Sequence, residues 1–154
     1  MMSCSICQLT QKPNALFYRD DDIMIWHCAD TTILGYLMIA PIRHIASYEL
    51  LTGKELAQFS RLSQWTIRFL KNFDPAIEKI YMCSFNELTP HVHFHLFPRY
   101  DWMLDWPHIQ DANNQIDAVK IFHHARENCI GPVDPQKINQ LAEQFKRALS
   151  QENP

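Results

Sequence analysis

The chain has 154 residues, of which 47% are hydrophobic and 20% are charged, and its formal net charge is −3. This length and composition indicate a single globular domain over residues 1–154 with a sizeable core. The acidic balance and the lack of a long basic run argue against a nucleic acid polymer as a partner.

No basic-then-apolar signal pattern opens the chain, and its most apolar run, residues 33–42, is too short to cross a bilayer. We therefore expect a cytoplasmic protein that does not contact membranes. The three glycines do not cluster, which excludes a Walker loop and a dinucleotide fingerprint. The cysteine count of five is odd, so a complete disulfide framework is not implied. The CxxC of Cys4 and Cys7 indicates metal or redox chemistry instead.

The first elements expected are two short strands, over residues 15–19 and 23–27, joined by a turn of three aspartates. A buried strand over residues 33–40 follows and ends at Pro41. Thr52 to Glu55 form a capping box, and apolar residues then recur at helical spacing to about residue 72.

Two further strands are expected over residues 77–85 and 91–99, and residues 100–130 show no clear pattern. Asp134 and Pro135 supply an N-cap and a first-turn proline for an amphipathic helix at the end of the chain. Strands joined by short links, with a long helix among them, predict an antiparallel α+β fold.

The segment HVHFHLFPR places His91, His93 and His95 in alternation with apolar residues. On a strand, the three imidazoles would share one face and the apolar side chains would pack on the other. Three interpretations stay open: a chance run on an exposed strand, a metal bound by all three rings, or chemistry on phosphate. The last uses the imidazole as a nucleophile and as an acid or base near neutral pH.

HVHFHLFPR resembles the motif of the histidine triad (HIT) family. CSIC near the start, the strand ending in proline, the Arg43-His44 pair, the long helix and the strand into the triad also match that family in order. The resemblance covers about residues 4–100 and leaves a C-terminal extension, 101–154. TPHVHFHLFPRY is most similar to the bacterial diadenosine polyphosphate hydrolase-like branch. The resemblance implies a HIT-like fold, that is, an antiparallel sheet with a long central helix and a C-terminal helix. It also implies a homodimer.

The resemblance also implies a function, namely nucleotide hydrolysis or transfer at the α-phosphate of a dinucleoside polyphosphate or nucleoside phosphoramidate. His93 matches the histidine that forms a covalent nucleotidyl intermediate, and His95 matches the one that contacts phosphate oxygen. Asn86 and Thr89, just before the triad, are candidate substrate-binding residues, although Asn86 could simply form a turn before Pro90. The alternative function is a nucleotide-binding module with little or no turnover.

In relatives with a CxxC, the resemblance implies a structural zinc ion held by Cys4, Cys7, His44 and His91. Two thiolates and two imidazoles suit tetrahedral zinc. The alternative is a pair of free cysteines and a surface histidine.

The sequence departs from the family pattern at two places. Tyr36 follows Gly35 where many members have a histidine, which puts the leaving-group chemistry in doubt. The acidic residue that binds ribose in relatives falls by spacing on Cys28, and Asp30 close by is the candidate substitute. Trp26 could flank a base or belong to the core.

Overall fold

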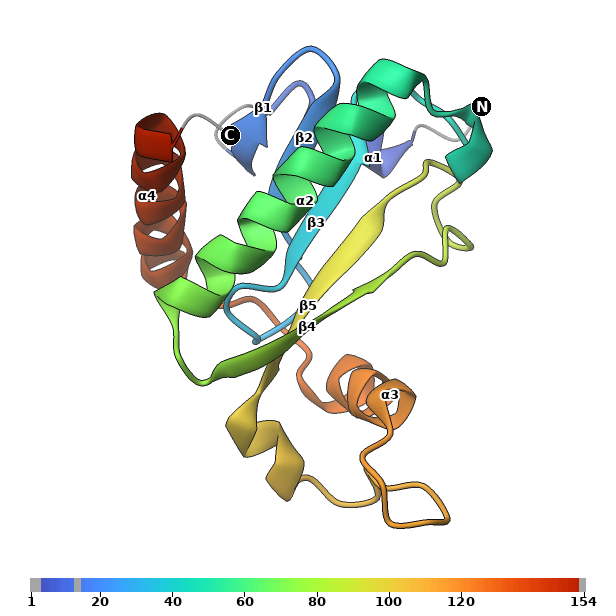
Figure 1. The fold of residues 1–154 in the computed structure, drawn as a ribbon, viewed down its shortest axis with the longest axis vertical. Coiled ribbons are helices and arrows are strands. Elements are labelled where there is room, and N and C mark those ends of the chain that lie inside the picture. The colour runs from blue at the N-terminus through green and yellow to red at the C-terminus, as the bar shows by residue number, and fades with distance from the viewer. Residues whose placement is uncertain (1–3, 13–14, 153–154) are drawn as a thin grey trace.

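A five-stranded antiparallel sheet forms the centre of the molecule in the computed structural model, which describes residues 4–12 and 15–152. Its strand order is β1-β2-β3-β5-β4 (Figure 1). The strands are β1 (Leu16–Arg19), β2 (Ile23–His27), β3 (Leu37–Pro41), β4 (Ile77–Cys83) and β5 (Phe94–Tyr100). The predicted antiparallel α+β class is thereby confirmed.

The helical elements are α1 (Ser5–Leu9), η2 (Tyr48–Leu50), α2 (Gly53–Phe73), η3 (Asp101–Asp105), α3 (Ala118–Asn128) and α4 (Pro135–Glu152). Figure 1 shows α2 lying across the sheet, with α4 beside it. Phe145 of α4 joins these layers, since its ring lies 4.9 Å from that of Trp65 on α2 and 5.7 Å from that of Phe17 on β1. Burial of such aromatic rings is a major source of core stability.

The hairpin of β1 and β2 forms where the sequence predicts it. The carboxylate of Asp20 accepts hydrogen bonds from the backbone amides of Asp22 (2.8 Å) and Ile23 (2.6 Å). An aspartate that binds its own turn in this way is the reason the three-aspartate segment reverses the chain.

The predicted capping box begins α2. The amide of Glu55 donates to the hydroxyl of Thr52, and the amide of Thr52 donates to the Glu55 carboxylate. Arg43 also reaches this carboxylate through Nε (3.0 Å) and Nη2 (2.7 Å). These hydrogen bonds, with Arg43 first, lower the pKa of the buried Glu55 to about 2. The loop after β3 is therefore fixed to the first turn of α2.

Two predicted strands begin later than expected. The chain turns at Gly35, whose φ of +79° is readily adopted by glycine, so β3 starts at Leu37 instead of residue 33. β5 starts at Phe94 instead of residue 91, which leaves His91 and His93 before the strand. The prediction that the three histidines share one face of a strand was therefore wrong. β4 ends at Cys83, two residues earlier than predicted.

The segment without a clear pattern, residues 100–130, contains η3 and α3. Phe122 of α3 packs against Phe97 (5.3 Å between ring centroids) and near His95 (6.0 Å). These two residues alternate along β5 with Phe94, which contacts Phe59 of α2 at 4.5 Å. Since alternate strand residues point to opposite faces, α3 covers the sheet on the side away from α2. In the described part of the chain, no helix is both long and apolar enough to cross a membrane.

Candidate functional site

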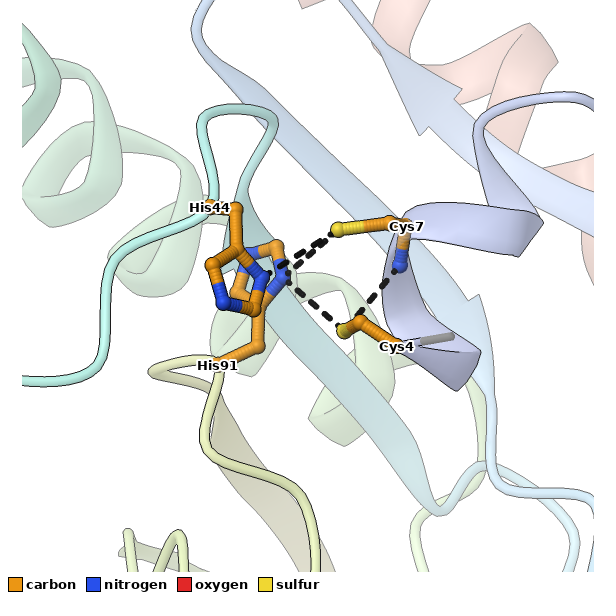
Figure 2. A group of neighbouring side chains, drawn as sticks. All are labelled: Cys4, Cys7, His44 and His91. Atoms are coloured by element: carbon orange, nitrogen blue, oxygen red, sulfur yellow. Dashed lines mark hydrogen bonds between the residues drawn. The ribbon is translucent and has the colours of Figure 1, made fainter. Parts of the chain in front are cut away.

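Cys4, Cys7, His44 and His91 meet at one place (Figure 2). One ligand atom from each lies within 4.8 Å of all the others. The first cysteine caps α1 and the second lies inside it, so one short turn presents both thiols. The sequence-predicted ligand set is thus brought together from three segments far apart in the chain.

The distances within this cluster fit a tetrahedral metal ion. Nδ1 of His91 lies 3.5 Å from both sulfurs, and Nδ1 of His44 lies 3.3 Å from Sγ of Cys7. With the usual zinc bond lengths, the edge from sulfur to nitrogen of a tetrahedron is about 3.6 Å. The donor types and the donor spacing therefore both suit zinc.

The surroundings of His91 also favour a ligand role. Its Nε2 lies 2.9 Å from the carbonyl oxygen of Pro41, so Nε2 carries the proton and Nδ1 presents its lone pair to the cluster. Burial, with smaller effects of His44 and His93, lowers the pKa of His91 and keeps the ring neutral. Burial and the neighbouring thiol of Cys4 raise the pKa of Cys7, an effect that a bound dication would reverse.

His93, two residues after His91, lies in a different environment. Its Nδ1 lies 2.7 Å from the carbonyl oxygen of His91, to which it donates, so Nε2 is the nitrogen left with a free lone pair. The half-buried ring lines a pocket of about 550 Å³. The backbone of the cluster residue His91 therefore sets the orientation of the ring at position 93.

Asn86 fixes the backbone of His93. Its Oδ1 accepts from the amide of His93 at 3.0 Å, and its Nδ2 donates to the hydroxyl of Ser84, which in turn donates to the carbonyl of His93. Asn86 has a φ of 57°, the left-handed conformation that asparagine tolerates in turns. Asn86 therefore both forms the turn and supports the histidine, while also lining the pocket.

His95 is the first of the three histidines to lie within β5, and its ring is 5.2 Å from that of His93. The hydroxyl of Tyr36 lies 2.7 Å from Nδ1 of His95. Burial raises the pKa of this tyrosine, so the phenol keeps its proton and donates it. Burial, His93 and Arg126 lower the pKa of His95 to about 4. The ring is thus neutral at pH 7, with Nε2–H available as a donor.

The pocket in front of these two imidazoles is lined on one side by apolar residues of α1, β2 and β3, including Ile6, Trp26 and Met38. Thr89 and the exposed Asp30, two of the candidate substrate-binding residues, also line it. Trp26 is 8% exposed and faces the pocket, so its two interpretations, core and pocket wall, are compatible.

A family model for the HIT domain matches residues 9–102. The chain belongs to the histidine triad family. The match includes the whole triad and stops short of α3 and α4, and it begins after the two cluster cysteines. No curated protein gives a significant sequence match.

Solved structures give the same HIT fold. A hypothetical histidine triad nucleotide-binding protein from Sulfolobus tokodaii is 14% identical with a TM-score of 0.67, over 96% of this chain and 93% of that one. A Zn-bound histidine triad family protein from Mycobacterium smegmatis is 14% identical with a TM-score of 0.63, over 99% and 96%. The diadenosine triphosphate hydrolase of Plasmodium falciparum is 13% identical with a TM-score of 0.59, over 91% and 79%.

Phe122 and Arg126 are among the residues of this HIT pocket that sequence analysis missed. They lie one helical turn apart on α3, in the segment where no pattern was found. Their spacing of four could have suggested one helix face, but nothing in the sequence indicates that this face meets the triad.

Proposed function

We propose that this HIT protein binds a nucleotide in the pocket and hydrolyses it at the α-phosphate, with His93 as the nucleophile. The observation that carries the proposal is the hydrogen bond from Nδ1 of His93 to the carbonyl of His91, which leaves Nε2 of the same ring as the nucleophilic atom beside a pocket of about 550 Å³. That volume lies within the range of small-molecule sites.

The proposed reaction has two steps. In the first, Nε2 of His93 forms a bond to the α-phosphorus while the bond to the leaving group breaks, and the electron pair leaves with that group. In the second, water attacks the same phosphorus, the nitrogen–phosphorus bond breaks, and a proton is released. Two displacements replace one difficult displacement, because imidazole is both a good nucleophile and a good leaving group.

Negative charge on the phosphate needs donors, and the described residues that line the pocket include no glycine. Nε2–H of His95 is one donor, held in that tautomer by the hydroxyl of Tyr36. The second N–H of Asn86 and the hydroxyl of Thr89 are further candidates for phosphate or sugar oxygens. Preorganised donors of this kind stabilise the charge that develops at the reacting group. Asp30 at the pocket edge is the proposed partner of the ribose hydroxyls.

We further propose that Cys4, Cys7, His44 and His91 hold a structural zinc ion. The name of the M. smegmatis relative, which describes it as Zn-bound, supports this proposal together with the donor spacing. Zinc would supply a fixed connection between α1, the loop after β3 and the triad. Because the carbonyl of His91 orients His93, fixing His91 also fixes the nucleophile.

The proposal is tested with a panel of dinucleoside polyphosphates and nucleoside phosphoramidates, assayed on wild type and on His93→Ala. We expect nucleotide release by the wild type and an acid-labile nucleotidyl adduct on His93 in mass spectra of rapidly quenched samples. A panel that is bound but not turned over would instead support the alternative, a nucleotide-binding module. Equal turnover by His93→Ala would contradict the assignment of the nucleophile.

We also propose a homodimer, by analogy with the family. β4 lies at the edge of the sheet, and its Met82 side chain is exposed. Phe85, just beyond the end of the strand, is exposed as well. Sedimentation equilibrium of the purified chain tests this proposal, and a single monomeric species at assay concentration would contradict it.

A further inference from the structure

Arg126 is the feature of the pocket that the proposed reaction does not use. It is the only lysine or arginine among the described residues that line the pocket. The residue is exposed and belongs to α3, outside residues 9–102 that match the HIT model. The C-terminal extension thus places a cation in the pocket where phosphate is proposed to bind, and this placement needs a physical explanation.

No carboxylate of a described residue forms an ion pair with this guanidinium. Among the ion pairs that the described residues form, none includes Arg126. Arg126 makes a weak contact from Nη1 to Sγ of Cys28 at 3.9 Å, and it also interacts with Tyr36, whose pKa it lowers. The acidic side chains of the pocket lining are Asp30 and Glu87, and neither pairs with it. With no acidic partner among the described residues, the guanidinium can bind an anion with its planar set of donors.

The position of Arg126 relative to the triad shows which side of the pocket its guanidinium occupies. His93 and His95 are adjacent, Tyr36 backs His95, and Arg126 acts on both Tyr36 and His95 electrostatically. Its other contact, Cys28, directly follows His27 at one end of β2. The cluster residue His91 instead contacts Pro41, which pairs with Ile23 at the other end of β2. The guanidinium thus lies on the His95 side of the pocket, and His93 lies toward the cluster.

The charges of the pocket indicate what Arg126 could bind on that side. His95 is neutral at pH 7, so this ring supplies a hydrogen bond but no full positive charge. A leaving group that consists of phosphate carries additional negative charge, whereas the amine that leaves a phosphoramidate does not. A full cation is needed in the first case only.

We propose that Arg126 binds the phosphate groups on the leaving side of the α-phosphorus, so that the site favours nucleotides whose leaving group is itself a phosphate. This inference rests on the proposed function, because it assumes that His93 attacks from the opposite side. It deepens that function by assigning the leaving-group preference to a residue of α3. Dinucleoside polyphosphates would then be preferred over phosphoramidates.

The test compares two substrates that share the adenylyl group, diadenosine tetraphosphate and adenosine 5′-phosphoramidate. Arg126→Ala should lower kcat/KM for the tetraphosphate by about 10- to 100-fold, the range expected for charge-assisted hydrogen bonds. The value for the phosphoramidate should change by less than about 3-fold, and Arg126→Lys should retain part of the preference. Equal losses on both substrates, or no loss on either, would overturn the proposal.

Lys120→Ala is the matched control, since Lys120 is an exposed cation on the same helix whose Nζ donates to the carbonyl of Gln110 outside the pocket. It removes one positive charge and should leave the ratio of the two kcat/KM values unchanged. Thermal unfolding of each variant tells loss of α3 structure apart from loss of a contact.

A binding arm separates this inference from the proposed function. In a His93→Ala background, calorimetry with AMP and with ADP should show tighter binding of ADP, and Arg126→Ala should remove that difference. If the wild type turned over neither substrate, the proposed hydrolysis would fail while this comparison still decided the role of Arg126. Equal binding of AMP and ADP with the arginine present would overturn the inference.

Discussion

The two halves of the histidine motif lie in different environments. His91 is fully buried, and its ring contacts two sulfurs and a backbone carbonyl, whereas His93 and His95 are half-buried and line the pocket. β5 begins only at Phe94, so the residues before it are free of the strand pleat and His91 turns toward α1. Regular spacing in a sequence therefore does not guarantee a common face when the strand starts inside the motif.

The largest expected effect separates these halves most directly. His93→Ala should lower the rate of nucleotide release at least about 10⁴-fold, because the covalent route is removed. Zinc content and the midpoint of thermal unfolding should stay close to wild type, because the ring is half-buried and lies outside the cluster. Metal analysis and calorimetry on the same preparation check this. Loss of zinc in this variant would contradict the separate roles of the two halves of the motif.

The converse change acts on the cluster. Replacing both Cys4 and Cys7 with serine should abolish zinc binding and lower the free energy of unfolding by about 4 kcal/mol when free zinc exceeds its Kd a thousandfold. Activity should fall as well, because His91 loses its fixed position. Denaturant unfolding with and without a chelator measures the change. Cys129→Ser, which alters a half-buried cysteine outside the cluster, is the control and should retain one zinc per chain.

A smaller effect is expected where the loop that carries His44 is attached to α2. Glu55→Gln should lower the free energy of unfolding by about 1–2 kcal/mol, since charged hydrogen bonds to Arg43 and a capping interaction are weakened. The pKa of Glu55 is about 2 when folded and 4.5 ordinarily, so its contribution is complete above pH 4.5. That contribution is lost as the pH falls toward 2.

The wild type should therefore lose more stability than Glu55→Gln between pH 5 and 3, as measured by urea unfolding. Glu143→Gln, at an exposed position of α4, is the control and should follow the wild type. Parallel curves for wild type and Glu55→Gln would show that the buried carboxylate does not stabilise the loop.

The smallest effect sharpens the comparison within the pocket. Tyr36→Phe should lower kcat about 10-fold, because His95 loses the donor that fixes its tautomer. That donor also stabilises the neutral ring, so the pKa of His95 should rise from about 4. The acid limb of the pH–rate profile should move to higher pH, which a purely structural role of the tyrosine would not produce. A reduced rate with an unmoved acid limb would contradict this role.

Much of the fold follows from local signals. The aspartates at residues 20–22 form the predicted turn, and Thr52 with Glu55 form the predicted capping box. Both depend on hydrogen bonds between residues at most three positions apart, so sequence is sufficient. The predicted starts of β3 and β5 were wrong because the positive φ at Gly35 and the contacts of His91 depend on distant parts of the chain.

The candidate site shows the same limit. Its predicted metal ligands were found together because a family motif specifies them, although they come from three separate segments. Arg126 and Phe122 belong to a helix that the motif does not include, and their approach to His95 depends on how α3 packs on the sheet. Tyr36 was recognised only as a departure, and its hydrogen bond to His95 could not be predicted without the register of β3 and β5.

The contact between Cys4 and His91 joins residues that are 87 positions apart. A metal ion bound there would act as a reversible cross-link that closes a long loop, and it would reduce the entropy of the unfolded chain much as a disulfide does. A shortened protein starting after Cys7 would keep every triad residue but would lose this cross-link. Expression trials should therefore retain the first residues of the chain and include zinc in the growth medium.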